Sequence, residues 1–478
     1  MTPKVHFLWL SLLIFLTLTA CAPSPQTSPV ADEKAIATGV AATLNAALSA
    51  TQQAFPTSTS SESISPTPEP TLPPPTSTVA PSPTSPVPST PSVMVAYTKY
   101  NDVFLWSPDR GAIRLTDMHD VASVSISSDG KLIAFKRQDA ESIALQELWV
   151  VNTSGIPDPQ QLVSASDLAA LVPPDARSGI LGYGVLNFSW RPKMHVLAYN
   201  TVVLHEGPGF DPNHDLRLVD ADTVQKTTLF EKSKGGLFYY SPDGNQIALS
   251  NPESISLVNA DGSNYRPDVL TFPNVITYSE YEYHPHPIWA LDSASLGVTI
   301  PPHDPLNDPQ PVTSLWLIHT DDSPAVLLGK ILAIPFAWPD QAFSPNLEFV
   351  GYSSPATGGN ANQRDLHVSH PDGSNYAIYA NGESLEFTSW SADSEHFIYA
   401  IQGGANEGLY IGGRLNPPVK LASDPHSVRG IHWIDATRFF YLLMKDNQWE
   451  LHLSNLEAED LALIDTIPDA SPEFDLIP

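Results

Sequence analysis

The chain has 478 residues, of which 23 are lysine or arginine and 52 are aspartate or glutamate, so its formal net charge is −29. A chain this acidic offers no basic stripe to neutralise phosphates, which argues against binding of nucleic acid or of anionic lipid headgroups. Its single cysteine, Cys21, excludes an internal disulfide.

Residues 1–20 have the features of an export signal. Lys4 precedes a mostly apolar run at residues 7–18, which is too short to span a bilayer as a helix. The run ends in Leu-Thr-Ala-Cys at residues 18–21, which resembles the lipobox of bacterial lipoproteins. The resemblance implies cleavage before Cys21, a lipid on its thiol, and an extracytoplasmic protein anchored to the cell membrane. The alternative is an unmodified thiol at the end of a signal peptide.

Two segments of different composition follow Cys21. Residues 21–55 contain an alanine-rich stretch with helical spacing and with Asp32 and Glu33 at its start, which predicts a short helix. This helix could serve oligomerisation or membrane contact, or be a marginal helix within a spacer. Residues 56–92 are mostly proline, serine and threonine and cannot bury apolar area. We expect them to form a disordered, extended stalk of roughly 100 Å.

The remainder, residues 93–478, repeats one short pattern. Its clearest copy is Ser-Pro-Asp-Gly at residues 241–244, followed by the apolar Ile-Ala-Leu at residues 247–249. Proline, aspartate and glycine favour a tight turn, and the apolar residues favour a buried strand. Two further turns, at residues 260–265 and 371–376, are nearly identical, which indicates internal duplication. A period of roughly 40 to 50 residues built from short strands is typical of a β-propeller.

These repeats resemble those of TolB-type and other WD-repeat-like β-propellers, over roughly residues 93–465. The resemblance implies an all-β propeller of seven to eight four-stranded blades. We expect eight, with seven blades, or a β-sandwich, as alternatives. The unit that begins near residue 94 has three recognisable strands, so we expect residues 474–477 to supply its fourth and close the ring. Four tryptophans that share one repeat position are expected to pack between blades. They are Trp190, Trp289, Trp390 and Trp433.

Three insertions are candidate ligand-binding loops at the propeller rim, because insertions on one face commonly carry binding sites. Tyr183 marks the first and His205 the second, while His284, His286 and His303 mark the third. For the last group, metal ligation, binding of another ligand and a plain surface loop all stay open. We expect no cofactor and assign no metal ligand and no catalytic residue.

Taken together, these features predict a lipid-anchored cell-surface propeller that acts as a non-catalytic binding or scaffold module for an envelope protein, peptide or glycan. The sequence contains no Gly-x-Ser-x-Gly, the motif of the hydrolase domain that accompanies oligopeptidase propellers. One alternative is an envelope hydrolase that acts on peptides or polysaccharide through paired carboxylates. The other is an accessory subunit of a TolB-like envelope complex.

Overall fold

The computed structural model describes most of the repeat region. The described residues are 93–138, 146–172, 179–205, 211–277, 282–308, 310–333, 342–360 and 362–478. The predicted signal peptide, Cys21, the alanine-rich helix and the stalk lie outside them. Within the described ranges, no helix has the length and apolar character needed to cross a membrane.

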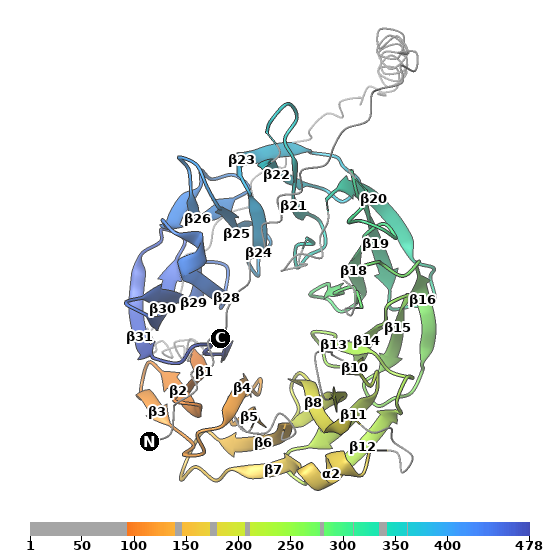
Figure 1. The fold of residues 1–478 in the computed structure, drawn as a ribbon, viewed down its shortest axis with the longest axis vertical. Coiled ribbons are helices and arrows are strands. Elements are labelled where there is room, and N and C mark those ends of the chain that lie inside the picture. The colour runs from red at the N-terminus through yellow and green to blue at the C-terminus, as the bar shows by residue number, and fades with distance from the viewer. Residues whose placement is uncertain are drawn as a thin grey trace, which may run out of the picture. The chain divides into compact units, whose positions relative to one another are not determined.

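The described strands form eight antiparallel sheets, which are the blades of a propeller (Figure 1). Blade 1 contains β32 (Phe474–Ile477), β1 (Met94–Lys99), β2 (Asp102–Ser107) and β3 (Gly111–Arg114), and blade 2 contains β4 (Val121–Ile126), β5 (Leu132–Gln138), β6 (Gln146–Asn152) and β7 (Gln160–Val163). Blade 3 contains β8 (Ile180–Trp190), β9 (Val196–His205), β10 (Asp211–Pro212), β11 (Leu216–Asp220) and β12 (Lys226–Phe230). Blade 4 contains β13 (Leu237–Tyr240), β14 (Gln246–Ser250), β15 (Ser254–Asn259) and β16 (Arg266–Thr271).

Blades 5 to 8 repeat this plan. Blade 5 contains β17 (Ile288–Trp289), β18 (Ser295–Ile300), β19 (Val312–His319) and β20 (Val326–Leu332), and blade 6 contains β21 (Val350–Pro355), β22 (Gln363–Ser369) and β23 (Ala377–Glu383). Blade 7 contains β24 (Glu386–Trp390), β25 (His396–Ile401), β26 (Gly408–Gly413) and β27 (Val419–Ala422). Blade 8 contains β28 (Val428–Trp433), β29 (Arg438–Lys445), β30 (Gln448–Asn455) and β31 (Asp460–Ile467). In blade 6 the innermost segment makes a single bridge, from Phe343 to Val350. The predicted eight-bladed propeller is confirmed.

The ring closes through the pairing of its first and last strands, as predicted. β32 pairs antiparallel with β1, and Tyr97 lies opposite Phe474. The carboxylate of Asp475 accepts hydrogen bonds from Ser125 Oγ (2.8 Å) and Ile126 N (2.9 Å) in blade 2. β1 is therefore paired on both sides, and β32 takes the innermost place in blade 1.

The core is divided among the blade interfaces. The described residues form eight hydrophobic clusters, each of which joins two neighbouring blades. The cluster between blades 8 and 1, for example, packs Tyr97 against Phe440 and Leu451, and all three side chains are fully buried. Burial of one such side chain contributes about 1.5–3 kcal/mol. Stability is therefore distributed around the ring and is not concentrated in one core.

The turns between the first and second strands have one geometry in six blades. In each, the first residue donates its N–H to the carbonyl five residues later at 2.8 or 2.9 Å, and the first residues are Ser127, Arg191, Ser241, Ala290, Ser344 and Ser391. Gly244 in the clearest copy has a φ of +76°, the left-handed conformation that glycine adopts without strain. Leu347 and Ser394 hold the same place at +60° and +65°. Repeats that have another residue in place of the glycine therefore keep the same turn geometry.

Tryptophans at the end of the first strand connect neighbouring blades, as expected. Three of them donate the indole N–H to a carbonyl of the preceding blade. These bonds run from Trp190 to Ser125 (3.0 Å), from Trp289 to Tyr239 (3.1 Å) and from Trp390 to Ala342 (2.9 Å). These indoles serve packing between blades and are not a stacking platform for a ligand.

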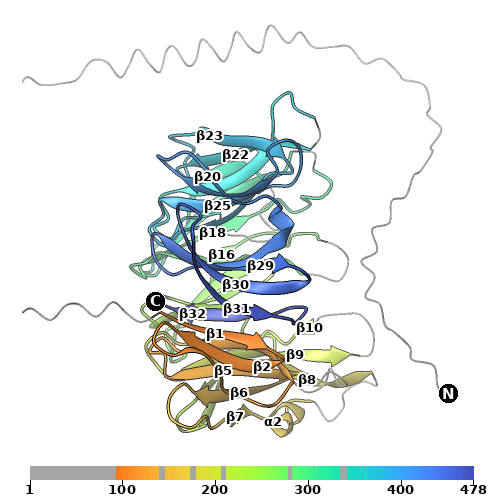
Figure 2. The same cartoon turned by 90° about the vertical axis from the view of Figure 1, so that its left-hand side faces the viewer.

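The alternation of strand direction divides the loops between two faces. Connections from first to second and from third to fourth strands emerge on one face, which we call the turn face. Connections from second to third strands and from blade to blade emerge on the other, which we call the connection face. In the side view, β10 and helix α2 (Ala165–Ala169), which belong to such connections, lie on the right (Figure 2). All three predicted insertions therefore open on the connection face.

Candidate binding site on the connection face

Two of the predicted site residues belong to an extended hairpin of blade 3. β8 and β9 are 11 and 10 residues long, longer than the other inner strands of the ring. Tyr183 pairs with Val203 across this hairpin and is only 4% exposed, within the cluster between blades 2 and 3. His205 ends β9 opposite Ile180 and is half-buried. The structure thus makes Tyr183 a packing residue, although sequence placed it in a rim loop.

The three histidines of the third insertion have separate surroundings. His286 is half-buried, with its ring 4.5 Å from that of Tyr239, and desolvation lowers its pKa to about 4. His303 is exposed, with Nδ1 2.6 Å from the carbonyl of Asn274. His284 stacks against His214 of blade 3. The contacts of His284 therefore differ from those of His286 and His303.

His284 belongs instead to a cluster with His214 and Glu282, which we call the histidine cluster. The two imidazole rings stack with centroids 5.2 Å apart and 26° between their planes. Glu282 Oε2 lies 3.3 Å from His214 Nε2 and 3.7 Å from His284 Nε2. The side chains are 20% exposed for His214, 8% for His284 and 58% for Glu282, so the cluster opens to solvent on the carboxylate side.

The backbone holds both histidines in place. His284 Nδ1 lies 3.1 Å from the carbonyl oxygen of Ser250, which can only accept, so Nδ1 carries the proton. The hydroxyl of Ser250 donates to the carbonyl of Pro285 at 2.6 Å. His214 has a left-handed φ of +47°, fixed by a bond from Gly235 N to its carbonyl (2.6 Å) and by the buried Asp215 beside it. Burial lowers the pKa of His284, which favours the neutral ring.

A second group of acids and histidine lies in blade 1 and its connection to blade 2. We call Asp102, Asp117 and His119 the aspartate cluster. Arg114 Nη2 lies 2.6 Å from Asp102 Oδ2 and also contacts Asp117. Asp102 is fully buried and accepts further bonds from Thr116 Oγ1 (2.9 Å) and Met118 N (2.6 Å). The guanidinium of Arg114 therefore already supplies the positive charge that a bound metal ion would bring to these carboxylates.

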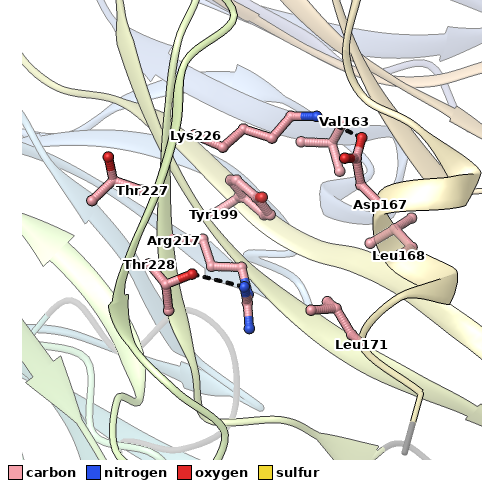
Figure 3. Close-up of a pocket in the computed structure, with 9 residues that line it drawn as sticks. All are labelled: Val163, Asp167, Leu168, Leu171, Tyr199, Arg217, Lys226, Thr227 and Thr228. Atoms are coloured by element: carbon pink, nitrogen blue, oxygen red, sulfur yellow. Dashed lines mark hydrogen bonds and ion pairs between the residues drawn. The ribbon is translucent and has the colours of Figure 1, made fainter.

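A small pocket of about 130 Å³ lies beside α2, between blades 2 and 3 (Figure 3). Lys226 Nζ is 2.6 Å from Asp167, and Arg217 is held by Asp215 (2.7 Å) and Thr228 (2.9 Å). Both cations of the pocket are thus neutralised within the described residues. Its remaining lining is Val163, Leu168, Leu171, Tyr199 and Thr227. This pocket offers no unsatisfied charge to a ligand.

Comparisons with known proteins find distant structural similarity and assign no activity. No family model and no curated protein shows significant similarity to the chain. TolB from Acinetobacter baumannii is 13% identical over 59% of this chain and 62% of its own, with a TM-score of 0.29. The propeller domain of the Trilobed protease from Pyrococcus furiosus is 12% identical over 73% and 99%, with a TM-score of 0.41. Porphyromonas gingivalis dipeptidyl peptidase 4 is 12% identical over 71% and 53%, with a TM-score of 0.46.

Sequence reasoning found part of the histidine cluster. The sequence marks His284 as a candidate, whereas His214 lies in the insertion marked by His205 and Glu282 carries no pattern of its own. The order of the strands in the blades is what relates His214 to Glu282. His214 follows a second strand, and Glu282 lies in a blade-to-blade connection, so both must emerge on the connection face of adjacent blades.

Proposed function

We propose that this protein is a non-catalytic binding or scaffold module that recognises an envelope protein, peptide or glycan through its connection face. The proposal includes membrane attachment through a lipid on Cys21 and a stalk formed by residues 56–92. The lipobox-like sequence at residues 18–21 and the composition of the stalk support this part.

The observation that carries the binding role is the difference between the two faces. On the turn face, the turns between first and second strands share one hydrogen-bond pattern in six blades. The connection face carries the longer and irregular connections, together with the histidine and aspartate clusters. Variable loops on a rigid repeating scaffold are where such proteins place ligand recognition.

Photocrosslinking on the two faces tests this role in cells that make the protein. The full chain would carry a photoreactive residue either at Leu306 on the connection face or at Tyr265 on the turn face, whose side chains are 38% and 43% exposed. We expect Leu306 to give a discrete adduct with an envelope component and Tyr265 to give none. Equal labelling from both positions, or labelling from Tyr265 alone, would contradict the proposal.

Two companion measurements separate the remaining parts. Replacement of Cys21 by alanine should release the chain from the membrane fraction if the cysteine carries the anchor. Purified full chain should leave a panel of peptides and polysaccharides intact. Turnover that disappears on substitution of connection-face acids would favour the envelope hydrolase instead.

A further inference from the structure

The buried ring nitrogen of His284 has no hydrogen-bond partner. Its Nδ1–H is used by the carbonyl of Ser250, so Nε2 presents a lone pair. This atom is buried without a hydrogen bond, and the side chain is only 8% exposed. An unsatisfied buried acceptor is unfavourable unless something donates to it or coordinates it. The lone pair faces Glu282 Oε2 at 3.7 Å, beyond hydrogen-bond length.

Two of the three distances between the ligand atoms are close to those around a tetrahedral metal ion. Ligands about 2.0–2.1 Å from zinc lie about 3.3–3.4 Å from one another. Glu282 Oε2 is 3.3 Å from one imidazole nitrogen and 3.7 Å from the other, and all three ligand atoms fall within 4.8 Å. Binding of one ion by both imidazoles would need a small rotation of His214, whose side chain is 20% exposed.

The structure assigns to His214, Glu282 and His284 a binding site for one divalent cation of the zinc class. Two imidazoles and one carboxylate suit Zn²⁺, Co²⁺ or Ni²⁺, whereas Ca²⁺ takes six to eight oxygen ligands. The hydrogen bond from His284 Nδ1 to Ser250 is the usual orienting contact of a ligating histidine.

The charge around the cluster also favours a cation. Among the described residues, Glu282 has ion pairs with the two histidines and with no lysine or arginine. The chain as a whole carries a formal charge of −29, which raises the local concentration of cations. Three protein ligands leave a fourth position open on the solvent side, where the exposed Glu282 lies. An exchangeable ligand can enter there from the connection face.

Titration of the metal-free full chain with Co²⁺ tests the site, because tetrahedral Co²⁺ absorbs visible light. We expect one equivalent to bind, with displacement by Zn²⁺ and not by Ca²⁺. His214→Gln and His284→Gln should each weaken binding by more than about 100-fold, since even loss of an orienting partner typically weakens binding about 10–100-fold. His119→Gln, in the aspartate cluster, is the matched control and should bind as the unaltered chain does.

Glu282→Ala keeps the test decisive if a histidine variant does not fold. Glu282 is 58% exposed, so its replacement should leave the thermal transition unchanged while weakening Co²⁺ binding at least about 10-fold. Absence of saturable binding, or equal affinity in the unaltered chain and these variants, would overturn the assignment. The titration needs no envelope ligand, so its outcome is independent of the crosslinking experiment.

Discussion

The histidine cluster and the aspartate cluster lie on the same face and contain the same two kinds of side chain, yet their electrostatic states differ. In the aspartate cluster, Arg114 and backbone N–H groups already bond the oxygens of Asp102. In the histidine cluster, the Nε2 of His284 has no donor. A group of acids and histidines is thus a candidate metal site only where its lone pairs are not already used.

The largest expected effect on stability comes from Asp102→Ala. This change leaves Thr116 Oγ1 and the Met118 N–H without their buried acceptor, so we expect unfolding free energy to fall by about 3 kcal/mol. Denaturant unfolding of the full chain measures it. Asp117→Ala is the control, and because Asp117 is 77% exposed the change should stay within about 0.5 kcal/mol. A loss below about 1 kcal/mol for Asp102→Ala would show that its bonds are dispensable.

The contribution of the Asp102 contacts to stability should also depend on pH. Burial by itself would raise the pKa of Asp102, but hydrogen bonds from Met118 and Arg114 outweigh burial and lower it. The folded state therefore holds the carboxylate charged where the unfolded state begins to bind a proton. This contribution is present above about pH 4 and is lost as pH falls through the lowered pKa. Between about pH 5 and pH 3, the unfolding free energy should thus depend less steeply on pH for Asp102→Asn than for the unaltered chain.

A smaller effect, confined to the histidine cluster, is expected from Ser250→Ala. Loss of the hydroxyl leaves the carbonyl of Pro285 unpaired and should cost about 1–2 kcal/mol. Because Ser250 orients the segment that carries His284, Co²⁺ affinity should also fall about 10-fold. Ser354→Ala removes a buried hydroxyl bonded to His367 in blade 6 and should lower stability without changing Co²⁺ affinity. If both variants bind Co²⁺ equally, Ser250 has no positioning role.

The smallest change in stability is expected from Glu282→Arg, which gives the histidine cluster a guanidinium like that of Arg114. Glu282 is 58% exposed, so the unfolding free energy should shift by no more than about 0.5 kcal/mol. Metal binding should nevertheless be lost, because the new cation repels the ion and one ligand is gone. Retained one-to-one Co²⁺ binding would mean that the ion binds elsewhere.

The fold was predictable because each blade repeats its local chemistry. Pro-Asp-Gly turns and apolar strands recur often enough to predict the blades, and the missing strand of the first unit indicated residues 474–477. The site was less predictable because it depends on contacts between blades. His214 and His284 are brought together by loops whose lengths follow no repeat.

The position of β1 decides how the ring responds to mechanical load. Any pull that reaches the propeller through residue 93 enters at β1, which is flanked by β2 on one side and β32 on the other. Such a force must break two ladders of hydrogen bonds together, whereas an edge strand can be peeled one bond at a time. Tyr97 and Lys99 add bonds to Asp465 of blade 8, at 2.7 and 2.6 Å. Ring closure therefore also reinforces the point at which tension would enter the propeller.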